Sequence, residues 1–319
     1  MRAMGRQYYV HPVFFLSLLV CGMLLLAGCS GGGFYSSKTP TKNDYRKGFG
    51  GIDMEFIPAA PPEEIPEDSL FSVGINLHNE GAFDVEDGIM VIDIDNDYIG
   101  LFGTPRRDFS LEGKSDLSPK GQGQDYFFEG TSKFLDTESS RRSVPVIASI
   151  CYPYETVLED TFCINKEGLS DSSVGEDVCE VRSHSYGGQG GPVGITSASV
   201  SVLNGEVDGT VIPVFDIYLK HSGNGLILES GNYRLACSAS PGGNENLARV
   251  KIKEITLSGV PLSCNKDTVL LNEGKARVRC ELSEHISAFQ MPYEAPFRMV
   301  LEYAYKNTET KIIDLLDFS

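Results

Sequence analysis

The sequence lacks tryptophan and is short of basic residues. Its 319 residues include no Trp, and 27 Lys and Arg stand against 44 Asp and Glu, which gives a formal net charge of −17. A nucleic-acid-binding surface needs basic side chains to neutralise phosphates, so this balance excludes nucleic acid as a partner. Sugar-binding faces of β-sheets use exposed aromatic side chains, and here 14 Tyr and 17 Phe can serve in place of Trp.

Recognisable catalytic and metal-binding motifs are also missing. No Ser stands in a G-x-S-x-G elbow, and the glycine-rich stretch 187–191 lacks the Lys of a phosphate-binding loop. Glycine occurs in loops far more often than it binds phosphate, so this stretch is interpreted as a linker. The cysteine spacings do not fit structural zinc, and the histidines are scattered singly. These absences favour a non-enzymatic protein without a cofactor.

One long apolar run is present, and it lies at the N-terminus. Arg2 and Arg6 precede the run 13–27, in which Ser17 alone is polar. A membrane-spanning helix needs about 20 apolar residues, and no second apolar stretch follows this one. The run therefore predicts an export signal over residues 1–28, with an uncleaved N-terminal anchor as the alternative.

The apolar run ends in the tetrapeptide Leu26-Ala27-Gly28-Cys29. This tetrapeptide resembles the lipobox of prokaryotic lipoproteins, and the resemblance implies cleavage before Cys29 and a lipid on its thiol. The membrane is then a partner through that lipid. Residues 29–47 begin with Gly and Ser and are expected to form a flexible tether.

Export fits the charge of the remaining chain. Residues 1–28 hold two of the basic residues and none of the acidic ones, so 25 basic and 44 acidic residues remain and the net charge becomes −19. Such a charge does not suit an anionic membrane face. We therefore expect a soluble part that the lipid holds at the outer face of the cell membrane.

Six cysteines remain when Cys21 of the signal and the lipid site are set aside. An even number in an exported chain predicts up to three disulfides, and zinc is the weaker alternative. Cys264 and Cys280 flank the turn residues 272–274 and are expected to pair with each other. The other candidates, whose connectivity stays open, are Cys151, Cys163, Cys179 and Cys237.

Beyond the tether the hydrophobic pattern has a period of two, with no long helical period. Residues 297–305 and 276–282 alternate apolar with polar side chains, which predicts half-buried antiparallel strands. In residues 250–257 the alternation changes phase after Lys253, which predicts a β-bulge or a change of neighbouring sheet. The sequence therefore predicts an all-β fold.

An internal repeat divides this all-β part. Residues 75–81 and 217–223 share the pattern I-x-L-x-[N/H]-x-G at an offset of 142 residues, and further strands start before them at Ile52 and Ile195. The closing Gly is expected to supply the positive φ of a tight strand exit. We predict two tandem Ig-like β-sandwich domains. The expected plan is a signal peptide at 1–28, a tether at 29–47, a first sandwich at 48–187 with a polar insertion at 103–142, a Gly-rich linker at 188–191 and a second sandwich at 192–319.

Several segments support a family resemblance. The strand ending in N-x-G resembles those of Ig-like adhesion-type modules, the CARDB class, in surface and S-layer-associated proteins of archaea. Residues 59–64, 151–156 and 190–193 resemble segments of an uncharacterised family of tandem Ig-like lipoproteins from small-genome archaea. This resemblance covers most of residues 48–319, departs from the family at the polar insertion, and implies the fold but no known activity.

One acidic segment is a metal candidate. Asp93, Asp95 and Asp97 are spaced like the start of a calcium loop, but the positions of the EF-hand Gly and Glu hold Tyr98 and Thr104. A calcium site between strands and a solvated acidic turn are the two interpretations.

The sequence as a whole favours binding over catalysis. We expect a lipid-anchored, exported binding or scaffold protein that contacts an unidentified surface protein or glycan. The alternative is an envelope enzyme, or an accessory subunit, with its site in the region 103–142. A deep pocket of converging titratable groups near that region favours the enzyme, and an open surface favours binding.

Overall fold

The computed structural model describes residues 45–135, 140–165, 179–231, 233–238 and 248–317. The segment Lys42–Ser319 forms one compact unit. The predicted signal peptide, the lipid site Cys29 and all but the last three residues of the tether lie outside the described residues. Within the described ranges, no helix is long and apolar enough to cross a membrane.

The all-β prediction is confirmed, because strands make up nearly all of the regular structure. The strands of the first part are β1 (Ile52–Phe56), β2 (Glu64–Pro66), β3 (Leu70–Asn79), β4 (Val85–Ile94), β5 (Ile99–Leu101), β6 (Arg106–Leu111), β7 (Gly123–Ser132) and β8 (Arg141–Ile164). One antiparallel sheet has the order β1-β3-β7-β5, and β6, β4 and β8 pair in that order in a second sheet.

The second part of the chain repeats this order of pairing. Its elements are β9 (His184–Ser185), β10 (Val193–Asn204), β11 (Thr210–His221), β12 (Leu226–Leu228), α2 (Tyr233–Ser238), β13 (Arg249–Leu257), β14 (Val260–Cys264), β15 (Thr268–Leu270), β16 (Lys275–Leu282), β17 (Ile286–Ser287), the 3₁₀ turn η2 (Ala288–Gln290) and β18 (Tyr293–Leu316). The order β10-β11-β16-β14 corresponds to β1-β3-β7-β5, and β15-β13-β18 corresponds to β6-β4-β8. The two copies of the sequence pattern therefore occupy matching strands, β3 and β11.

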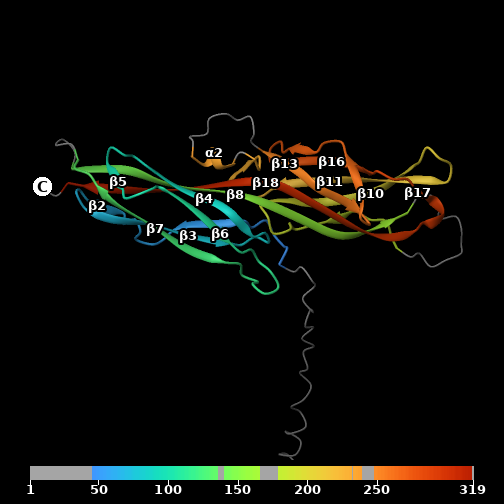
Figure 1. Ribbon diagram of the computed structural model, residues 1–319, viewed down its shortest axis with the longest axis horizontal. Coiled ribbons are helices and arrows are strands. Elements are labelled where there is room, and N and C mark those ends of the chain that lie inside the picture. Colours follow the sequence, from blue (N-terminus) through green and yellow to red (C-terminus); the bar gives the residue numbers. More distant parts are fainter. Residues whose placement is uncertain (1–44, 136–139, 166–178, 232, 239–247, 318–319) are drawn as a thin grey trace, which may run out of the picture. The chain divides into compact units, whose positions relative to one another are not determined.

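The two longest strands connect these two sets. β8 and β18 have 24 residues each and pair antiparallel along their whole length, with Pro153 opposite Ala304 at the middle. Figure 1 shows them side by side through both sets of strands. On its other side, the first half of β8 pairs with β4, and the first half of β18 pairs with β13. We call this pair the β8–β18 ribbon.

The predicted linker 188–191 is buried against both sets of strands. The Gln189 side chain accepts a hydrogen bond from Ile195 N at 2.8 Å and donates one to Ile195 O at 3.0 Å, and Gly190 N donates to Gly48 O at 2.8 Å. Together with the ribbon, these contacts tie the two parts of the chain together. The division into two Ig-like sandwiches stays a prediction.

Local strand predictions agree with the structure. Along β18, Phe297, Met299, Leu301 and Tyr303 are buried at alternate positions, as a strand with one face in the core requires. The pairing of β13 with β18 shifts register between Ile252 and Glu254. The predicted bulge at Lys253 is therefore confirmed.

Candidate functional site

A cleft of about 680 Å³ opens beside the middle of the β8–β18 ribbon. Three separate parts of the chain line it: the connection from β3 into β4, the centre of the ribbon, and the segment before α2. The lining residues are Ala82, Phe83, Asp84, Glu86, Asp87, Pro153, Tyr154, Glu155, Ser230, Gly231 and Glu302. Five of these eleven side chains are carboxylates, so the cleft is acidic.

Two of the carboxylates face each other across the ribbon. Glu155 on β8 lies directly opposite Glu302 on β18. Like charges in directly opposed positions destabilise a sheet, so this pair requires counter-charges. Lys253 forms an ion pair with Glu155, and Lys251 lies 3.9 Å from Glu302. The hydroxyl of Ser230 also donates to Glu302 at 2.8 Å. The carboxylate of Glu155 raises the pKa of Lys253, first through the hydrogen bond between them.

The other acidic wall comes from the start of β4. Asp84 accepts a hydrogen bond from Gly113 N at 2.7 Å, which fixes its carboxylate at the rim. Asp87 accepts a hydrogen bond from Tyr233 Oη at its backbone carbonyl, at 2.8 Å, and its carboxylate lies 3.4 Å from Arg234. The α2 segment therefore bridges the two walls of the cleft.

Four buried tyrosines support the cleft from the core side of the ribbon. Each hydroxyl bonds a backbone group outside the ribbon, and burial raises the pKa of all four. The bonds are Ile52 N to Tyr152 at 3.0 Å, Tyr154 to Gly190 O at 2.6 Å, Val193 N to Tyr303 at 3.2 Å and Gly225 N to Tyr305 at 2.6 Å. Tyr152 and Tyr154 therefore pack in the core and offer no exposed aromatic surface.

These tyrosines also explain the glycine that closes each repeat pattern. A Cβ on Gly81 would lie 1.8 Å from the hydroxyl oxygen of Tyr154, and one on Gly223 would lie 2.1 Å from that of Tyr305. Neither glycine has the positive φ that the sequence led us to expect. The glycine is needed because the tyrosine hydroxyl takes up the space of a side chain.

A second polar cluster lies near the far end of β8. Asp160 accepts a hydrogen bond from Tyr186 Oη at 2.6 Å and lies 2.6 Å from His184 Nδ1. Burial raises the pKa of Asp160, but the hydrogen bonds from Tyr186 and His184 outweigh it and lower the pKa overall. The His184 ring stacks on Phe162 at 4.4 Å. This cluster fastens the short strand β9 to β8.

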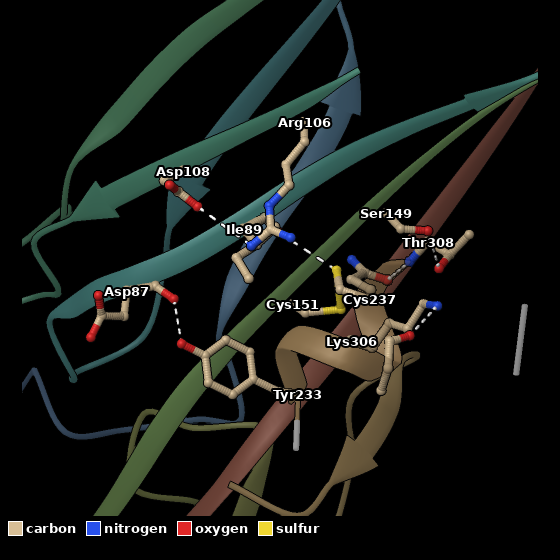
Figure 2. The surroundings of a disulfide bond; sticks show 12 residues. Asp87, Ile89, Arg106, Asp108, Ser149, Cys151, Tyr233, Cys237, Lys306 and Thr308 are labelled. Carbon is tan, nitrogen blue, oxygen red and sulfur yellow. Dashed lines mark hydrogen bonds and ion pairs between the residues drawn. A yellow bond between two sulfur atoms is a disulfide. The ribbon is translucent and has the colours of Figure 1, made fainter. Parts of the chain in front are cut away.

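The six cysteines form three disulfides. The expected pair Cys264–Cys280 joins directly opposed residues of β14 and β16. The remaining pairs are Cys151–Cys237 and Cys163–Cys179. Figure 2 shows Cys151–Cys237 between β8 and α2, close to the cleft.

The predicted calcium residues do not gather into a cage. Among the described residues, no group of three or more His, Cys, Asp or Glu side chains is arranged to hold a metal ion. Asp95 Oδ1 instead accepts a hydrogen bond from Asp97 N at 3.0 Å, within the turn between β4 and β5.

The polar region 103–142 forms strands and does not line the cleft. It contains β6 and β7 and the start of β8, and no residue that lines the cleft comes from it. Sequence reasoning missed the cleft because its walls come from segments that are far apart in the chain. The one local signal is the acidic run Asp84-Val85-Glu86-Asp87.

The chain was compared with known proteins. No protein-family model matches it, and no curated protein matches it. Among solved structures, it is similar to the secreted serine protease VesC from Vibrio cholerae, with a TM-score of 0.21 and 8% sequence identity over 82% of this chain and 51% of that chain. The chain thus spans about half the length of that protease. A TM-score this low does not indicate a shared fold.

Proposed function

We propose that this chain is an exported, lipid-anchored protein of the cell surface that binds a partner without catalysis. Its anchor is the lipid on Cys29, and the acidic cleft is its binding site. The partner that the cleft suits is a surface protein that presents Lys or Arg side chains.

The acidity of the cleft carries this proposal. Opposite charges across an interface steer the encounter between partners and set its register. The cleft places five carboxylates around one opening, and three basic side chains, Lys251, Lys253 and Arg234, offset part of that charge, so the surroundings stay net negative. The net charge of −19 that remains after removal of residues 1–28, with 25 basic and 44 acidic residues, adds a long-range attraction for a cationic partner.

Charge removal at the cleft tests this function. The probe is a fluorescent pentalysine peptide, titrated by anisotropy against the full chain in detergent micelles at low and at high salt. We expect the double variant Glu86→Gln/Asp87→Asn to bind at least fivefold more weakly at low salt. The matched control, Asp53→Asn/Glu55→Gln, removes the same charge from exposed positions of β1. Equal weakening in both variants would show that net charge acts without a site, and would refute the cleft.

The anchor has a separate test. Mass spectrometry of the membrane fraction is expected to find the chain cleaved before Cys29 and carrying lipid there. A Cys29→Ala chain that is still cleaved and still bound to the membrane would contradict the proposed anchor.

A further inference from the structure

One wall of the cleft is a thin segment on the outer face of the ribbon. It runs through β12, residues 229–231 and α2, and we call it the strap. α2 has six residues, whereas isolated helices shorter than about 12–15 residues are marginal in water. The position of α2 therefore depends on its contacts with the sheet.

Those contacts include one disulfide. Cys237 of α2 is bonded to Cys151 of β8, and both are buried. Around them lies a small apolar cluster that is separate from the main core: Ile89, Cys151, Leu228, Tyr233, Cys237 and Ala304. Lys306 Nζ donates to Ala236 O at 3.2 Å, and burial lowers the pKa of Lys306. Figure 2 shows the disulfide, Tyr233 and Lys306 grouped where α2 meets the ribbon.

The strap shapes the cleft through two hydrogen bonds. Ser230 and Gly231 line the cleft, and the Ser230 hydroxyl donates to Glu302 at 2.8 Å. Tyr233 Oη donates to the carbonyl of Asp87, on the opposite wall. Movement of α2 away from the ribbon breaks the Tyr233 contact with the opposite wall.

The other two disulfides do not hold α2 against the ribbon. Cys264–Cys280 joins strands that are already paired, and Cys163–Cys179 lies at the end of β8. None of the described cysteines lines the cleft itself, but Cys237 alone belongs to α2, the helix whose Tyr233 bonds the cleft wall at Asp87. Cys151–Cys237 joins residues 86 positions apart, whereas the other pairs are 16 apart.

We propose that Cys151–Cys237 is a redox latch on the acidic cleft, an inference that rests on the proposed binding function. Both sulfurs are buried, so α2 first opens locally. A dithiol reductant then attacks the disulfide and is itself oxidised to a disulfide, while two electrons and two protons pass to Cys151 and Cys237 as thiols. α2 then leaves the ribbon while β12 stays paired with β18, and the cleft loses affinity for cationic groups.

Hydrogen exchange of the full chain in detergent tests the latch directly. In the double variant Cys151→Ser/Cys237→Ser, and in the native chain treated with dithiothreitol, we expect amides of residues 233–238 to exchange at least tenfold faster. Amides of the β8–β18 ribbon should keep their protection, which also shows that the variant is folded. The matched control is Cys264→Ser/Cys280→Ser, in which the strap should exchange as in the native chain.

Binding of the pentalysine peptide is the second readout. We expect at least threefold weaker binding in the Cys151→Ser/Cys237→Ser chain and unchanged binding in the control. Unchanged exchange in the strap overturns the latch, and so does equal loosening in the control or loss of protection throughout the ribbon. If the strap loosens but no chain binds the peptide, the strap's release is supported and the proposed cationic ligand is refuted.

Discussion

The hydroxyl of Tyr303 tests how the start of β10 is fastened to the β8–β18 ribbon. Val193 N donates to this hydroxyl at 3.2 Å, and Thr156 Oγ1 lies 2.9 Å from it. Tyr303 is fully buried, so water cannot replace the lost group after Tyr303→Phe. Thr156 loses its bond to the Tyr303 hydroxyl but keeps its bond to Val193 O at 2.7 Å, so the N–H of Val193 is the donor left without a partner.

The size of the effect follows from that single unpaired donor. A buried donor without a partner costs about 1–3 kcal/mol, whereas the change from Tyr to Phe leaves the packing of the ring intact. We expect Tyr303→Phe to lower the free energy of unfolding by about 2 kcal/mol. Tyr152→Phe removes the acceptor of Ile52 N in the matching position of the other part, and the same loss is expected there.

Urea unfolding followed by far-UV circular dichroism measures this loss. The matched control is Tyr218→Phe, because Tyr218 is 42% exposed on β11. That control should stay within about 0.5 kcal/mol of the native chain. If Tyr303→Phe and Tyr218→Phe have the same stability, the Tyr303 hydroxyl does not fasten β10 to the ribbon and the reasoning fails.

Three further predictions concern pH, packing and charge. Burial raises the pKa of Tyr152 and Tyr303 well above the usual value, so the unfolded chain releases these protons first. Above about pH 10, urea unfolding should therefore show stability falling with rising pH, by up to about 1.4 kcal/mol per pH unit for each tyrosine, and the slope should be smaller in Tyr303→Phe. Gly81→Ala should lower the free energy of unfolding by about 1–3 kcal/mol, since the Tyr154 hydroxyl occupies the space that the new methyl group needs. Thermal unfolding measures this loss, and an unchanged melting temperature would contradict it. The control Gly187→Ala should be neutral, because a Cβ there meets no atom within 4 Å. Lys253→Gln leaves Glu155 without its ion pair and should lower the free energy of unfolding in urea by less than about 1 kcal/mol. Added salt should reduce this difference, and an effect insensitive to salt would argue against a charge origin.

Much of the local structure could be predicted from the sequence because its signals are local. Alternation along 297–305 and 276–282 predicts strands, and the change of phase at Lys253 predicts the bulge that β13 contains. The pairing of Cys264 with Cys280 is predicted correctly, although the turn 272–274 leads from β15, a neighbour of β13, into β16, and Cys264 lies on β14, which pairs with β16. The repeated I-x-L-x-[N/H]-x-G pattern identified two strands that occupy matching places in the sheets.

The long-range arrangement could not be predicted in this way. An alternating pattern indicates that a strand has one buried face, but it does not identify the strand that lies beside it. Nothing in residues 141–164 indicates that their partner is 293–316 or that the pairing runs for 24 residues. The cleft depends on that pairing, because Glu155 and Glu302 become neighbours through it alone.

One residue of the ribbon accounts for where the cleft opens. β4 pairs with β8 as far as Ile89 opposite Cys151, and continuing that register would place Asp87 opposite Pro153. Proline has no N–H to donate to a neighbouring strand, so the ladder cannot continue past this point. The carbonyl of Asp87 instead accepts its hydrogen bond from Tyr233 of α2. The start of β4 therefore leaves β8 at Pro153, the carboxylates of β4 separate from those of the ribbon, and the strap fills the position that a paired strand would otherwise occupy.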